Sequence, residues 1–147
     1  MTRALVGEDV ARRINEAFPE SATRTNETDV WVEPDSVAGV ARFLKDADGL
    51  DFSYLSALTA VDYVEYFELV YHLLSMRRNH SVVLKTQIYG RESPTAQSVI
   101  GVWQGADLQE REVWDLMGIR FHGHPNMKRI LLWEGFPGHP LKKDFLG

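Results

Sequence analysis

The chain has 147 residues, which suits one domain with a sizeable buried core, and its 44% apolar and 25% charged residues are typical of a globular protein. It contains no cysteine, which excludes disulfides, thiolate metal sites, cysteine-bound iron–sulfur clusters and a cysteine nucleophile. The net charge of −5 is uneven, because residues 1–109 carry 10 basic and 16 acidic side chains while residues 110–147 carry 6 and 5, a distribution that disfavours nucleic-acid binding.

No apolar run approaches the roughly 20 residues that cross a bilayer, and the start of the chain lacks the apolar core of a signal peptide. We therefore expect any association with a membrane to come through a partner protein. The glycine motifs of nucleotide-binding loops and the serine motif of hydrolases are absent from the sequence.

Two amphipathic helices are predicted in the first third of the chain. Residues 8–18 repeat apolar side chains at helical spacing, and a second such pattern runs from Pro34 to Leu44. Between them, residues 21–29 are polar and are predicted as a loop that leads into a short strand at 30–32.

Three longer strands are predicted at residues 52–63, 66–76 and 81–89, because apolar and polar side chains alternate there. The polar residues 77–80 have the length of a hairpin connection between the last two strands. This order of elements predicts an α+β fold with helices packed on a mixed, largely antiparallel sheet.

We expect a single domain over residues 1–147, in which residues 1–105 are an α+β scaffold. Residues 106–147 would add a helix and an extended C-terminal docking segment. The helix is predicted from Leu108 to Met117, with Asp107 and Glu110 forming a capping box and Gly118 ending it in the left-handed conformation.

Asp115 is unusual because a carboxylate in the last helical turn meets the negative end of the helix dipole. One interpretation is a surface ion pair with Arg111, four residues earlier, which would contribute less than about 1 kcal/mol. The other is that Asp115 binds a basic group elsewhere, in this chain or in a partner.

Two enzymatic interpretations apply to the same segment. Glu110 and Glu112 are two residues apart, so on a helix their carboxylates point about 200° apart and do not converge on one substrate. His122, His124 and His139 could ligate a metal ion in a small metalloenzyme, although a Gly-His-Pro turn is also explained by backbone contacts alone.

Basic pairs beside apolar residues predict a contact surface. Lys128 and Arg129 precede an apolar run from Ile130 to Trp133, and Lys142 and Lys143 follow Leu141. Arginine, tryptophan and aliphatic side chains are the usual anchors of protein interfaces. An extended docking segment therefore fits this region better than a catalytic pocket.

The string EREVWDLMGIRFHGHPNMKRIL, followed by GFPGHPLKKDF, resembles the signature of the thirty-kilodalton subunit of respiratory complex I, which is the C subunit of the bacterial NADH–quinone oxidoreductase and the J subunit of the chloroplast and cyanobacterial enzyme. The resemblance, together with the basic and apolar anchors, marks these residues as signature or partner-docking positions: Glu110, Arg111, Glu112, Asp115, Gly118, Phe121, Gly123, His124, Pro125, Lys128, Arg129, Ile130, Trp133, Gly138, His139, Pro140, Lys143 and Asp144.

The resemblance implies a structural subunit of the hydrophilic arm of a proton-translocating NADH:quinone oxidoreductase, peripheral on the cytoplasmic face of the membrane. It also implies that such a subunit has no catalytic centre or cofactor of its own. NADH, FMN, the iron–sulfur clusters and the quinone would be held by partners, among them the large quinone-site subunit on which it docks. Related membrane-bound hydrogenases, formate hydrogenlyase, and deazaflavin- or ferredoxin-driven complexes contain equivalent subunits.

Overall fold

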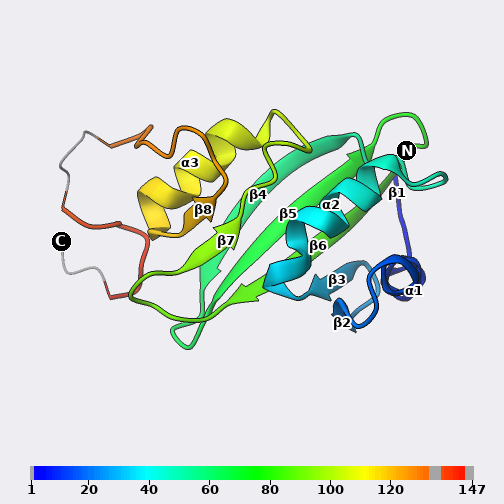
Figure 1. The fold of residues 1–147 in the computed structure, drawn as a ribbon, viewed down its shortest axis with the longest axis horizontal. Coiled ribbons are helices and arrows are strands. Elements are labelled where there is room, and N and C mark those ends of the chain that lie inside the picture. The colour runs from blue at the N-terminus through cyan, green and yellow to red at the C-terminus, as the bar shows by residue number, and fades with distance from the viewer. Residues whose placement is uncertain (1, 133–136, 145–147) are drawn as a thin grey trace.

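The computed structural model describes residues 2–132 and 137–144 (Figure 1). Two amphipathic helices, a central sheet and a third helix follow one another along the chain. The elements are β1 (Arg3–Ala4), α1 (Gly7–Ala17), β2 (Ala22–Thr25), β3 (Asp29–Val32), a single 3-10 turn (Pro34–Ser36), α2 (Val37–Asp46), β4 (Tyr54–Asp62), β5 (Phe67–Ser75), β6 (His80–Ile88), β7 (Thr95–Gln97), α3 (Ala106–Met117) and β8 (Arg120–His122).

The main sheet has the strand order β2-β3-β6-β5-β4, and β1 also pairs with β6. The pairs β1–β6 and β3–β6 are parallel, whereas β2–β3, β4–β5 and β5–β6 are antiparallel. Strands β7 and β8 form a separate parallel pair. The predicted α+β fold with a mixed, largely antiparallel sheet is therefore confirmed.

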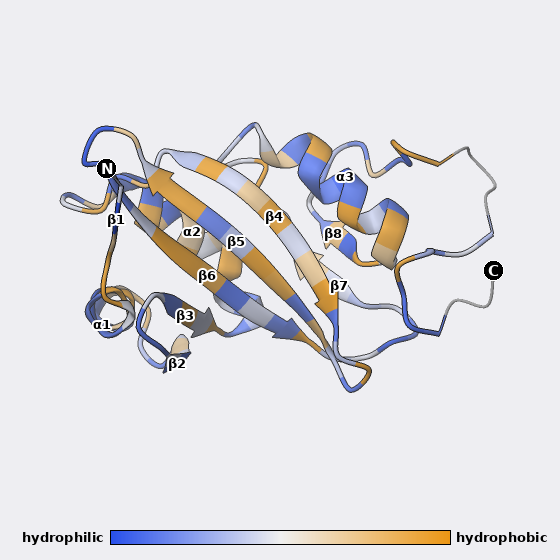
Figure 2. Ribbon diagram, turned by 180° about the vertical axis from the view of Figure 1, so that it is seen from behind, coloured by the Kyte–Doolittle hydropathy of each residue, from blue (hydrophilic) through white to orange (hydrophobic). Residues whose placement is uncertain are grey.

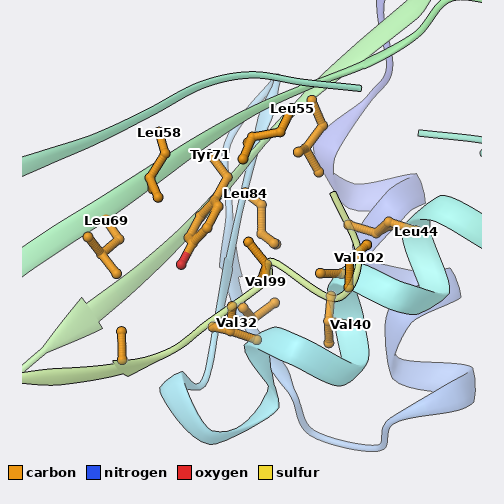
Figure 3. Close-up of a cluster of buried hydrophobic side chains, with 14 of the residues drawn as sticks. Val32, Val40, Leu44, Leu55, Leu58, Leu69, Tyr71, Leu84, Val99 and Val102 are labelled. Atoms are coloured by element: carbon orange, nitrogen blue, oxygen red, sulfur yellow. The ribbon is translucent and has the colours of Figure 1, made fainter. Parts of the chain in front are cut away.

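Alternation along β5 and β6 divides the sheet into two faces. Leu69, Tyr71 and Leu73 of β5 and Leu84 of β6 are buried on the inner face. Helix α2 covers that face and adds apolar side chains, including Leu44, to the same cluster (Figure 3). Burial of these side chains is the main source of the stability of the scaffold.

The outer face of the central strands has no helix over it in the described part of the chain, as the view from behind shows (Figure 2). Helix α3 lies beside the edge strand β4, on the far side of the sheet from α1 (Figure 1). The Gln109 side chain joins the two, because its Oε1 accepts the Leu58 N–H and its Nε2 donates to the Leu55 carbonyl. One edge of the sheet is thereby closed by the helix that carries the signature residues.

Several short elements differ from the predictions. Residues 22–25 form β2 and not a loop, because the Asn15 side chain binds both the N–H and the carbonyl of Ala22 and aligns the segment with β3. The helix predicted from Pro34 begins with a 3-10 turn and becomes α-helical only at Val37. The strands β7 and β8 are too short to show a period in the sequence.

Candidate docking surface

Helix α3 carries the first residues of the signature. It ends at Gly118, whose φ of 78° is the left-handed conformation predicted for it. The predicted capping box is wrong, because the helix begins at Ala106 after Gly105 and no side chain caps it. Asp107 consequently lies inside the first turn, and Glu110 binds other groups.

Glu110 connects α3 to the loop before it. Its fully buried carboxylate accepts the Ser98 hydroxyl at 2.6 Å and the Val99 N–H at 2.8 Å. Burial raises the pKa of Glu110, and these two donors only partly oppose that effect. Ser98 also donates its N–H to the His122 carbonyl, so the same contacts fix β8. Glu112 is exposed, and the two glutamates do not share a site.

Asp115 is fully buried and holds the C-terminal segment against α3. Its Oδ1 accepts Arg129 Nη1 at 2.9 Å, and its Oδ2 accepts three consecutive backbone N–H groups, those of Ile130 (3.3 Å), Leu131 (2.7 Å) and Leu132 (2.8 Å). Burial alone would raise the pKa of Asp115, but the three N–H donors and the guanidinium together hold it below its usual value. Its basic partner is therefore Arg129 of the same chain.

Arg111 does not pair with Asp115, so the surface-pair interpretation is wrong. Its guanidinium donates to the carbonyls of Lys128 (3.1 Å) and Arg129 (3.2 Å). Arg129 in turn donates to the Gly138 carbonyl at 2.7 Å. The charged side chains of the signature thus bind the backbone of the C-terminal segment, which has few regular hydrogen bonds of its own.

His139 packs against the end of α3. Its Nδ1 donates to the Asp115 carbonyl at 3.0 Å, and its ring lies 4.7 Å from that of Trp114. A Cβ on Gly118 would come within 2.8 Å of the His139 ring, so glycine is required there for space as well as for conformation. Burial lowers the pKa of His139, which favours the neutral ring.

The other histidines have separate environments. The His124 Nδ1 accepts the Asn126 N–H at 2.9 Å, which places the proton on Nε2, and that nitrogen faces the Asp107 carbonyl at 3.2 Å. His122 is exposed on β8. Within residues 2–132 and 137–144, no three potential ligands gather as a metal site would need.

A second anchor, Asp62 with Arg91, has no counterpart among the sequence predictions. The two side chains form a bidentate pair at 2.6 and 2.7 Å, and Asp62 is almost fully buried. Asp62 also accepts the Lys143 N–H at 2.8 Å, and Asp144 lies 3.3 Å from the Arg91 guanidinium. The hydrogen bond from Arg91, despite burial, holds the pKa of Asp62 well below its usual range.

The anchored segment leaves apolar side chains exposed. We define the docking surface by its exposed residues Leu108, Lys128, Ile130, Leu131 and Leu141, of which Leu131 and Leu141 are 59% and 60% exposed. Other predicted positions vary: Phe121 is in the core, Pro125 and Lys143 are exposed, Pro140 is half-buried and Gly123 has a φ of 95°. Trp133 lies outside the described residues.

The profile of the family described as "Respiratory-chain NADH dehydrogenase, 30 Kd subunit" matches residues 30–147. The NADH-quinone oxidoreductase C subunit of Roseiflexus sp. (strain RS-1) is 40% identical, over 96% of this chain and 84% of that protein. An NADH-quinone oxidoreductase C subunit of Rhizobium meliloti (strain 1021), the one numbered 2, is 44% identical, over 78% of this chain and 63% of that protein.

Among solved structures, the fold is similar to a chain of the membrane-bound sulfane sulfur reductase, an archaeal respiratory membrane complex. The TM-score is 0.75 at 26% identity, and the match covers 95% of this chain and 85% of the other. The signature on α3, the fold and the extent of these matches agree, and the chain belongs to the family of the 30 Kd subunit of respiratory-chain NADH dehydrogenase.

Proposed function

We propose that this chain is a structural subunit of the hydrophilic arm of a proton-translocating NADH:quinone oxidoreductase, and that its docking surface binds the large subunit that bears the quinone site. The subunit braces that partner while electrons pass from NADH to quinone. NADH, FMN, the iron–sulfur clusters and the quinone are held by other subunits in this proposal.

The observation that carries the proposal is the contact of the buried Asp115 with Arg129 and the backbone of residues 130–132. Three backbone N–H groups and a guanidinium on one carboxylate fix a segment that would otherwise lose much conformational entropy on binding. Ile130 and Leu131 are then presented outward as apolar anchors on a preformed backbone, which suits a lasting structural contact.

We also propose that the subunit is peripheral on the cytoplasmic face of the membrane and meets the membrane only through the assembly. In the described residues, no helix has both the length and the apolar character of a membrane span. The relatives named as subunits of an NADH-quinone oxidoreductase support the same placement.

An equivalent place in a related respiratory complex is the second candidate, favoured by the similarity to a chain of the archaeal sulfane sulfur reductase. Purification of the assembly through a tag on this chain separates the two. Co-purification of NADH-binding, FMN-binding and quinone-site subunits supports the first proposal. Recovery of a hydrogenase or sulfur-reducing module would favour the second, and recovery of the chain alone would contradict both.

A further inference from the structure

A second surface lies on the outer face of the sheet, at the end where the β4–β5 hairpin turns and β6 ends (Figure 2). We call the side chains of Tyr63, Tyr66 and Tyr89 the tyrosine row. Their rings are in contact, with centroids 5.2 Å apart for the first pair and 5.4 Å for the second. Tyr63 is 48% exposed and Tyr89 is 65% exposed.

The tyrosine row is part of a larger apolar patch, because Val61 and Val64 beside it are 38% and 53% exposed. Single exposed apolar residues need no explanation, but a contiguous patch indicates an interaction site. Tyrosine is enriched in such sites because its ring is apolar while its hydroxyl remains compatible with water.

The backbone that carries the row is fixed before any partner binds. Val64 has a φ of 72°, which is rare for a β-branched residue, and both its polar backbone groups are held. The Asp62 carboxylate accepts its N–H at 2.8 Å, and Arg91 donates to its carbonyl at 3.0 Å. A preorganised surface loses less conformational entropy on binding.

A hollow of about 260 Å³ adjoins the row, lined by Trp31, Glu33, Pro34 and Tyr89 among others. Its walls are aromatic and apolar, and its charged lining residue is the exposed Glu33. Aromatic rings beside a carboxylate provide the chemistry that binds a lysine or arginine side chain, through cation–π contact and a charge-assisted hydrogen bond.

The charges around the patch point to the same ligand. Glu33, Glu65 and Glu68 have no lysine or arginine within ion-pair distance in the described residues. Glu68 is 4% exposed, and the indole Nε1 of Trp31 donates to it at 2.7 Å. The basic side chains nearby are already in use, because Lys85 pairs with Asp29 and Arg24 lies on the Trp31 ring.

We propose that the tyrosine row and the adjoining hollow bind a basic segment of another protein subunit, with one lysine or arginine side chain entering between Trp31 and Tyr89 toward Glu33. The partner backbone then lies across the tyrosine rings. This contact is separate from the docking surface on α3 and does not depend on which large subunit that surface binds.

Cross-linking in the assembled complex tests the proposal. A photoreactive benzophenone amino acid takes the place of Tyr89, and in a matched control it takes the place of Tyr54, which is 51% exposed at the other end of β4. After irradiation of the purified complex, the expected product at position 89 joins a lysine- or arginine-containing segment of another subunit. A product within this chain, with a second copy, with lipid or with a segment lacking basic residues would overturn the proposal, as would no product.

A charge variant adds an independent readout. Because the expected contact is electrostatic and partly exposed, Glu33→Gln combined with Tyr89→Ala should make the complex dissociate at several-fold lower salt than the wild type. Tyr54→Ala should leave that salt midpoint unchanged. Equal midpoints for all three proteins, at unchanged melting temperatures of the isolated chain, would contradict the assignment.

Discussion

The carboxylate of Asp115, in the last turn of α3, lies 2.9 Å from the guanidinium of Arg129 and is fully buried beneath the segment that Arg129 begins. A buried carboxylate near the negative end of a helix dipole is unfavourable unless it is compensated. The compensation comes from one cation and three backbone N–H groups, all in the chain's own C-terminal segment. The segment and the helix therefore depend on each other for their structure.

Asp115→Asn should destabilise the folded chain by roughly 1–3 kcal/mol, because Arg129 loses the counter-charge of Asp115 and one acceptor oxygen is replaced by a donor. Thermal and urea unfolding measure the change. Asp48→Asn is the control, because the side chain of Asp48 is fully exposed and its surface pair with Arg78 should contribute little. Equal stability of the two variants would show that the Asp115 contact does not hold the segment.

Gly118→Ala should cost about 1–2 kcal/mol, since alanine disfavours the left-handed conformation and its Cβ would lie 2.8 Å from the His139 ring. Gly105→Ala is the matched substitution at the other end of α3, where φ is −60° and a Cβ would meet nothing within 4 Å. That change should be neutral or slightly stabilising. Similar losses of melting temperature at both positions would contradict the described helix end.

Glu110→Gln should change the pH dependence of stability. Because the pKa of Glu110 is raised in the folded chain, its contribution is fully present below the unfolded value and is lost as pH rises through the folded pKa. Glutamine cannot ionise, and its amide can still accept the Val99 N–H and contact the Ser98 hydroxyl. The stability of the variant relative to wild type should therefore improve as the pH rises above 4.5, the ordinary pKa of a glutamate, as measured by urea unfolding. A difference independent of pH would contradict the raised pKa.

Asp62→Asn should loosen the end of the C-terminal segment without unfolding the scaffold. The substitution removes the charge that binds Arg91 and weakens the acceptor of the Lys143 N–H. Hydrogen exchange at the Lys143 amide should become faster by about tenfold or more, given roughly 1–2 kcal/mol for a hydrogen bond to a charged group. The amide of Leu141, which donates to the Leu116 carbonyl, serves as a nearby reference. Unchanged exchange at Lys143 would indicate that Asp62 does not anchor it.

Sequence patterns predicted the elements whose periodicity is long. Strands β5 and β6 and helix α1 lie within a few residues of their predicted ranges, because nine or more residues alternate or repeat on a buried face. The pattern did not predict strand β2, since its four residues are mostly exposed and owe their alignment to the Asn15 side chain. Local pattern does not contain such a distant contact.

The site residues show the same division. The sequence identified Asp115 as unusual, and the geometry of α3 predicted that Glu110 and Glu112 diverge. It did not show that Glu110 binds Ser98 and Val99 and not the helix start, because a capping box and a buried contact between a helix and a loop use the same residue types. The Asp62–Arg91 anchor escaped prediction because nothing in the local sequence distinguishes its members from ordinary surface charges.

The role of the docking surface is tested most directly by one pair of substitutions. Leu131→Asp places a charge on the exposed apolar anchor, and Met76→Asp places the same charge on the β5–β6 turn, where Met76 is 71% exposed. Each tagged variant is expressed in the native host, and the amount of co-purified large quinone-site subunit is measured against wild type. We predict at least a tenfold loss for Leu131→Asp, at an unchanged melting temperature of the isolated chain, and no loss for Met76→Asp. Full recovery of the large subunit with Leu131→Asp would contradict docking through this surface.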